Sequence, residues 1–237
     1  VSDLIKSDLL FLKMAKTVEN AKLDSVWVGD SLFAKPRLEP MTTLAAIASI
    51  TEKVRLGTAV LLMSLRHPVL LAQTMATVDL ISNGRLVIAA GTGGAFNADQ
   101  KQEWQVAGVN QRTRALRLEE MVQILKGLGT GDPFSFDGTH FALSELTMRP
   151  PTVEESGIPI LAGVIVIKSV KMAKTLNSIP GITVPDSIIS RLANSEDLKN
   201  TSSEIAAEII SDLLELTKGV HIMAIGWENQ IPPILER

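Results

Sequence analysis

The chain of 237 residues contains no cysteine. This absence excludes disulfide bridges, thiolate nucleophiles, iron–sulfur clusters and cysteine-ligated zinc sites. Histidine is also scarce, and the three histidines show no spacing typical of a metal site. We therefore expect a protein that works without a bound metal ion.

The sequence also lacks strong charge and long apolar runs. Its formal net charge is −3, and it has no basic run of the kind that follows a nucleic-acid backbone. It contains no signal peptide and no apolar stretch long enough to cross a bilayer. We expect a cytoplasmic protein that acts on a small molecule, with neither nucleic acid nor a membrane as its partner.

What the chain does have is an alternation of helical and strand-like segments, with enough hydrophobic residues (46%) for the core of one α/β domain. The predicted strands are Ser25–Asp30, Val54–Leu62, Leu86–Ala90, Ile158–Ile167 and Val220–Ile225. The predicted helices are Leu9–Asn20, Met41–Ile50, His67–Ile81, Arg114–Leu128, Lys168–Asn177, Pro185–Ala193 and Ser202–Thr217. Such alternation is typical of βα units and a parallel sheet.

Two local features modify this pattern. Asp132–Phe141 reads as a hairpin-like excursion, and the helix before it is expected to end at Gly127 and Gly129. The turn Ser82–Arg85 is interpreted as structural, because its Asn-Gly pair supplies the positive φ of a tight turn.

Five predicted strands are fewer than the eight of a closed (β/α)₈ barrel. The first helix begins almost at residue 1, so the strand that should precede it is absent from the sequence. We therefore expect an α/β fold of the (β/α)₈ TIM-barrel type, incomplete or hybrid. An open sheet has edge strands that proteins pair or cover, which predicts a homodimer.

The strand Leu86–Ala90 and the loop Gly91–Gly94 form the most informative segment. The strand is apolar without alternation, which is typical of a parallel strand buried on both faces. The glycine-rich loop leaves backbone amides bare, so that a phosphate or a flat ring can approach closely. Simple close packing of the backbone is the alternative explanation for these glycines.

Short motifs in the first two thirds of the chain, from about Leu9 to Gly163, form an ordered set. They are Asp24–Asp30, Val54–Val60, His67–Val69, Ser82–Arg85, Gly91–Gly94, Gly131–Gly138 and Ile158–Gly163. Together they resemble the luciferase-like family, which contains FMN-dependent monooxygenases and F420-dependent reductases. The resemblance implies an oxidoreductase that transfers hydride or activates oxygen on a small organic substrate.

A second resemblance begins where the first one ends. Gly163–Ala173, Pro180–Pro185 and Gly219–Glu228 are similar to the C-terminal part of methylenetetrahydrofolate reductase, which is also a flavin-binding barrel. We therefore interpret 1–237 as a single barrel-type domain with a luciferase-like part, 1–163, and a reductase-like part, 164–237. A methylenetetrahydrofolate reductase-like enzyme and a non-catalytic hybrid or degenerate barrel are the alternative functions.

The luciferase-like resemblance implies FMN or F420 as cofactor, with FAD less favoured, bound at the carboxyl ends of the strands. The expected contacts are Asp30, Ala59, Val60, Leu61, Gly91, Thr92, Gly93, Gly94, Asn97 and Gly163. The family also places a non-prolyl cis peptide near Val60–Leu62. No catalytic residue is identified. Ser31 stands where F420-dependent members of the family often have histidine. This difference weakens the interpretation as an F420-dependent dehydrogenase.

Several residues have a structural interpretation beside the functional one. Asp30 is expected either in an Asx turn or helix cap, or in contact with the cofactor or substrate. The arginines Arg112, Arg114 and Arg117 are predicted to form a solvated helix face, with contact between one of them and a phosphate or a carboxylated substrate as the alternative. We expect His67 to be a structural or capping residue, His140 to lie on the surface and His221 to lie in the core.

Overall fold

The computed structural model describes residues 10–179, 181–215 and 217–236. Its main sheet has five parallel strands in the order β1-β2-β3-β6-β7, and β4 and β5 form a separate antiparallel pair. Two positions used above, Leu9 in the first helix and Pro180 in a motif, lie outside the described residues, as does the segment that would precede the first helix. The described part is an incomplete barrel of the TIM type.

All five strands of the main sheet are confirmed, with ends that differ from the prediction by two residues or fewer. They are β1 (Ser25–Val28), β2 (Arg55–Leu61), β3 (Leu86–Ala90), β6 (Ile160–Ile165) and β7 (Val220–Met223). The hairpin-like excursion is also confirmed, as β4 (Phe134–Asp137) and β5 (Ala142–Leu146).

The predicted helices are present as well. They are α2 (Leu10–Asn20), α3 (Pro40–Ala48), α4 (Pro68–Ser82), α6 (Arg114–Gly129), α7 (Val170–Asn177), α8 (Asp186–Ala193) and α9 (Leu198–Leu214). Four further elements were not predicted: α5 (Ala98–Val106), α10 (Ile231–Leu235) and the 3-10 turns η1 (Met63–Leu65) and η2 (Glu228–Gln230).

The turn between α4 and β3 has the structural role expected of it. Asn83 has φ 56° and Gly84 has φ 77°, the left-handed conformations that an Asn-Gly pair tolerates. Arg85 donates to the Thr51 hydroxyl at 2.9 Å and to the Val54 carbonyl at 2.9 Å. The turn therefore fixes the amino ends of the strands, away from their carboxyl ends.

Helix α6 ends at Gly129, one residue beyond the predicted end, but Gly127 lies inside the helix and does not end it as predicted. A Cβ at position 127 would lie 2.0 Å from a ring carbon of Phe134. Gly127 thus lets β4 pack directly against the helix, and the chain leaves the helical path only at Gly131, whose φ is +77°.

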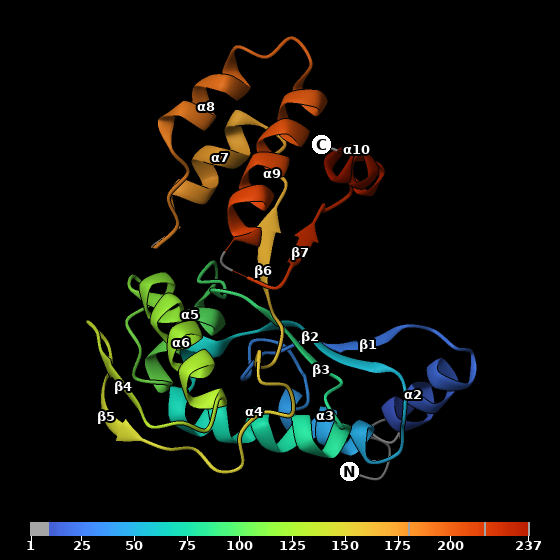
Figure 1. The fold of residues 1–237 in the computed structure, drawn as a ribbon. Coiled ribbons are helices and arrows are strands. Elements are labelled where there is room, and N and C mark those ends of the chain that lie inside the picture. Colours follow the sequence, from blue (N-terminus) through green and yellow to red (C-terminus); the bar gives the residue numbers. More distant parts are fainter. Residues whose placement is uncertain (1–9, 180, 216, 237) are drawn as a thin grey trace.

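The sheet is covered by helices in two separate regions (Figure 1). Helices α3 and α4 contact β1–β3, whereas α9 contacts β6 and β7, with α7, α8 and α10 gathered around it. The hydrophobic clusters follow this arrangement. One lies behind β1–β3 and reaches Ile160, and the other two are formed between Val164 and Ile234.

Candidate functional site

The loop that follows β3 is held by its carbonyl groups. The Gly93 carbonyl accepts a hydrogen bond from Nε of Arg114 at 3.2 Å, and the Gly94 carbonyl accepts one from Nε1 of Trp104 at 2.8 Å. Within the described residues, the amides of Thr92, Gly93 and Gly94 donate to no acceptor. The loop therefore presents free N–H donors at the carboxyl end of a parallel strand, which suits an anion.

Close packing explains Gly91. A Cβ there would lie 2.4 Å from Cγ2 of Val60, so the strand end of β2 presses directly on this glycine. The peptide bond between Ala59 and Val60 is cis, as the family resemblance implied. Gly93 differs from Gly91, because its φ is +72° and a Cβ would also lie 2.8 Å from the Trp104 ring.

The expected apolar wall at the end of β2 is only partly available. Leu61 is fully buried in the core behind the sheet, so only its backbone remains at the strand end. Ala59, Val60 and Leu62 are partly exposed there. These three residues, rather than the Leu61 side chain, can meet a flat ring.

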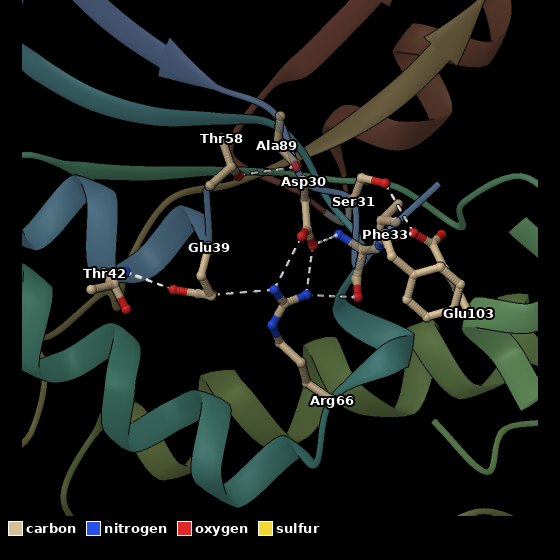
Figure 2. A network of polar contacts seen from close by, with 10 residues as sticks. Asp30, Ser31, Phe33, Glu39, Thr42, Thr58, Arg66, Ala89 and Glu103 are labelled. Atoms are coloured by element: carbon tan, nitrogen blue, oxygen red, sulfur yellow. Dashed lines mark hydrogen bonds and ion pairs between the residues drawn. The ribbon is translucent and has the colours of Figure 1, made fainter. Parts of the chain in front are cut away.

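Asp30, two residues after the end of β1, forms the centre of a polar network (Figure 2). Its carboxylate is 3% exposed and pairs with Arg66 through Oδ2–Nη1 at 2.5 Å and Oδ1–Nη2 at 3.1 Å. It also accepts the Leu62 amide at 2.9 Å. In the described residues Asp30 caps no helix, so the interpretation as a cap is wrong. The carboxylate instead joins the ends of β1 and β2.

Arg66 has a second partner in Glu39, whose Oε1 lies 3.2 Å from Nη2. Burial alone would lower the pKa of the Arg66 guanidinium, but Asp30 and Glu39 outweigh this effect and raise the pKa above its ordinary value. Beside the network is an open cleft of about 370 Å³. Its lining residues are Asp30, Ser31, Leu32, Arg37, Glu39, Leu65 and Arg66.

Glu103 on α5 holds the loop after β1. Its Oε1 accepts hydrogen bonds from the Ser31 hydroxyl at 2.9 Å and from the amides of Phe33 and Ala34, both at 2.8 Å. Glu103 is 3% exposed. Burial raises the pKa of this carboxyl, but the hydrogen bonds outweigh burial and hold the pKa below its usual value. Sequence reasoning missed Glu103 because α5 was not predicted.

The lowered pKa of Glu103 leads to a pH-dependent prediction. We expect Glu103→Gln to lower the free energy of unfolding by roughly 1–2 kcal/mol at pH 7, since a hydrogen-bonded ionised carboxylate is lost. An acid with a depressed folded-state pKa stabilises the fold fully above its unfolded pKa, about 4.3. That contribution is lost as pH falls through the folded-state pKa, so the difference between variant and parent should shrink in acid.

Urea unfolding at several pH values between neutrality and pH 3 measures this difference. Glu119→Gln is the matched control, because Glu119 is an exposed glutamate on α6. A difference for Glu103→Gln that stays constant down to the lowest pH would contradict the prediction.

The prediction of a solvated arginine face is wrong for two of its three residues. Arg112 is exposed, but Arg114 is 0% exposed and Arg117 is half-buried. Arg117 donates to the Ser64 carbonyl at 3.1 Å, and its guanidinium lies 4.4 Å from the centroid of the Phe141 ring. Burial lowers the pKa of both guanidinium groups.

Two further predicted contacts have definite places. Asn97 is the N-cap of α5, and its Oδ1 accepts the Gln100 amide at 2.9 Å. Gly163 was expected at a strand end, but β6 continues to Ile165. Gly163 is nevertheless close to the glycine loop, because its neighbour Ala162 pairs with Ala90, the last residue of β3. The predicted cofactor contacts that lie on or just after β1, β2, β3 and β6 thus belong to four neighbouring strands of the sheet.

The histidines differ partly from expectation. His67 is the N-cap residue of α4, without a side-chain capping bond. His140, expected on the surface, is half-buried, and His221, expected in the core, is half-buried on β7 and outside the hydrophobic clusters. Among the described residues no group of three acidic or histidine side chains could hold a metal ion, and no helix is long and apolar enough to cross a membrane.

The relatives of this chain include both F420-dependent and flavin-dependent enzymes. An F420-dependent glucose-6-phosphate dehydrogenase from Amycolatopsis mediterranei is 32% identical over 64% of this chain and 48% of its own length. The oxygenase component of a flavin-dependent trigonelline monooxygenase from Acinetobacter baylyi is 27% identical over 63% of this chain and 41% of its own length. The chain spans about half the length of the curated relatives that it matches.

A solved structure shows the same fold. The oxygenating constituent of 3,6-diketocamphane monooxygenase from Pseudomonas putida, in complex with FMN, has a TM-score of 0.64 at 15% identity. The alignment covers 86% of this chain and 57% of that one.

Family models match two segments, as the motifs predicted. The model for methylenetetrahydrofolate reductase matches residues 146–237. The model for luciferase-like monooxygenase matches residues 11–182, which is more than half of the sequence. The chain therefore belongs to the luciferase-like monooxygenase family.

Proposed function

We propose that this chain is a flavin- or deazaflavin-dependent oxidoreductase that binds FMN or F420, with FAD less favoured, and acts on a small organic substrate. The observation that carries the proposal is the loop Gly91–Gly94, in which the carbonyls of Gly93 and Gly94 are held while the amides of Thr92, Gly93 and Gly94 donate to no acceptor of the described residues. Ligands of parallel α/β sheets bind at this carboxyl edge. The F420-dependent relative and the neighbour of the same fold that was solved in complex with FMN support the same cofactor class.

The residues present fit such a cofactor. The free amides of Thr92, Gly93 and Gly94 suit its phosphate, and the partly exposed Val60 suits one face of its ring. The proposed contacts remain Asp30, Ala59, Val60, Leu61, Gly91, Thr92, Gly93, Gly94, Asn97 and Gly163. A bound flavin or deazaflavin supplies the hydride chemistry, and the protein binds and orients it.

The organisation of the chain is also a proposal. We regard 1–237 as one barrel-type domain with a luciferase-like part, 1–163, and a reductase-like part, 164–237. The three hydrophobic clusters support a division near this position, because none of them draws core residues from both parts. A cytoplasmic location and a homodimer, in which the open sheet edges are paired, belong to the same proposal.

Cofactor titration tests the function. Quenching of tryptophan or flavin fluorescence should report binding of FMN or F420 at micromolar concentration, and weaker binding of FAD. Gly93→Ala should weaken binding about tenfold, a loss of about 1.4 kcal/mol, because the added Cβ meets Trp104 at a position with φ +72°.

Gly108→Ala is the matched control, since Gly108 also has a positive φ, +66°, but a Cβ there meets no atom within 4 Å. If the two variants bind the cofactor with equal affinity, the loop Gly91–Gly94 is not part of the cofactor site. Absence of binding for all three cofactors at micromolar concentration would leave the non-catalytic barrel as the explanation.

The reductase-like alternative rests on the family match over 146–237. It predicts reduction of methylenetetrahydrofolate with NAD(P)H. Turnover of that substrate by the purified chain would favour it over the luciferase-like activity.

A further inference from the structure

The two faces of the main sheet differ in how they are covered. Side chains on one face belong to the hydrophobic clusters, among them Val26, Leu56, Leu86, Ile88, Val164 and Ile222. The alternate side chains point to the other face, which we name the open face and define by its larger side chains: Trp27, Val87, Leu161, Ile165, His221 and Met223. None of the open-face residues belongs to a hydrophobic cluster of the described residues.

Trp27 shows how exposed this face is. Its side chain is 41% exposed, and its ring lies on Gly57 of β2, where a Cβ would be 2.2 Å from a ring carbon. The other five residues are all partly exposed. Parallel sheets are almost always buried on both faces, so a partly apolar open face calls for a cover.

The two outer strands of the sheet are open as well. In the described residues, β1 pairs only with β2 and β7 pairs only with β6. Both edge strands have four residues, so each could pair with the other over its whole length. Such unpaired edges are the usual place where another chain adds to a sheet.

We propose that a second copy of this chain closes the sheet, with β1 of each copy paired in parallel with β7 of the other. A two-fold axis parallel to the strands keeps all strand directions the same, and it forms both contacts at once. The two open faces then enclose one common interior, as in a barrel. The proposal specifies the contact of the homodimer put forward above.

Charge at the amino ends of the edge strands supports this pairing. Asp24 directly precedes β1 and Lys218 lies just before β7, and both side chains are exposed. A parallel β1–β7 contact brings these opposite charges to the same end of the pair. In an antiparallel β1–β1 contact, the Asp24 residues of the two copies would lie at opposite ends of the strand pair. Lys218 would take no part in that contact.

Closure also completes the candidate site. The ends of β1, β2 and β3 line one side of it, and the second copy would supply strand ends for the opposite side. Only this consequence rests on the proposed cofactor function, because the open face and the edges require a cover with or without a flavin.

Sedimentation and a charged variant test the contact. The chain should sediment as a dimer at micromolar concentration, and Trp27→Glu should sediment as a folded monomer. Leu80→Glu is the matched control, because Leu80 on α4 is similarly exposed, at 45%, on a helix behind the sheet. It should remain a dimer. A monomeric parent chain, or a dimeric Trp27→Glu, would overturn the proposal.

Cross-linking tests the strand pairing without relying on that variant. The chain has no cysteine, so introduced thiols give unambiguous products. Double variants that combine Ser25→Cys or Trp27→Cys with His221→Cys or Met223→Cys sample the possible registers. Adjacent strands are about 4.8 Å apart, within disulfide range, whereas β1 and β7 of one copy are four strand spacings, roughly 19 Å along the sheet, apart.

At least one double variant should form a covalent dimer on a non-reducing gel, and Ser25→Cys alone should not. A cross-link from Ser25→Cys alone, or none from any double variant, would overturn the pairing. Failure of the proposed function is distinguishable from these outcomes. A cross-linked dimer that binds neither FMN nor F420 would refute the oxidoreductase and leave the closure in place.

Discussion

Arg114→Met should lower the free energy of unfolding by roughly 2–5 kcal/mol, because it leaves buried carbonyl groups without their donors. The guanidinium is fully buried and donates to the Gly93 carbonyl at 3.2 Å and to the Gln111 carbonyl at 2.5 Å. Methionine replaces the volume of the side chain but none of its hydrogen bonds. The expected loss is large for a single substitution.

Urea unfolding measures this effect, and Arg112→Met provides the matched control two residues earlier. Arg112 is exposed, so its replacement should change stability by less than about 0.5 kcal/mol. If both variants lose the same stability, Arg114 has no special role. Because Arg114 also holds the Gly93 carbonyl, its replacement should weaken cofactor binding beyond the effect of Arg112→Met.

The periodicity of apolar residues in α6 indicates that Arg114 could be buried. In α6, Arg114 shares a helical face with Leu118, Met121 and Leu125, at spacings of four, seven and eleven residues. An arginine on the apolar face of a helix must find acceptors or remain exposed. Its acceptor Gly93 is 21 residues away in the sequence, so only the tertiary fold decides between these outcomes.

The strands could be predicted because each is an apolar run bounded by turn residues. Leu86–Ala90 was placed to the residue, since its apolar run starts after an Asn-Gly turn and stops at Gly91. By contrast α5 has mostly polar residues and no apolar period. It depends on the Asn97 cap and on tertiary bonds of Glu103 and Trp104, which a sequence pattern cannot contain.

The same reason limits prediction of the site. Asp30 and the glycine loop could be located because they follow strands, whose carboxyl ends meet at one edge. Arg66 could not, because its role depends on Asp30, 36 residues earlier, and on the turn η1 that brings it back toward β1. The residues proposed to contact the cofactor can therefore be recognised in the sequence, whereas the residues that hold them in place are identified only by the tertiary fold.

Asp30→Ala should lower the free energy of unfolding by roughly 2–4 kcal/mol. It leaves the half-buried Arg66 without its main partner and the Leu62 amide without an acceptor. A double-mutant cycle with Arg66→Met should give a coupling of about 2 kcal/mol, because removal of both charges avoids the unpaired buried carboxylate.

The ion pair between Arg191 and Glu208 offers a matched cycle. Its closest N–O distance is 2.6 Å, almost that of Asp30–Arg66, but its side chains are 40% and 58% exposed rather than 24% and 3%. Water screens the exposed pair, so its coupling should stay below about 1 kcal/mol. Equal couplings in the two cycles would mean that burial gives the Asp30 network no added strength. A larger coupling for Asp30 would identify this network as the clamp between the ends of β1 and β2, and Asp30→Ala should then also weaken cofactor binding.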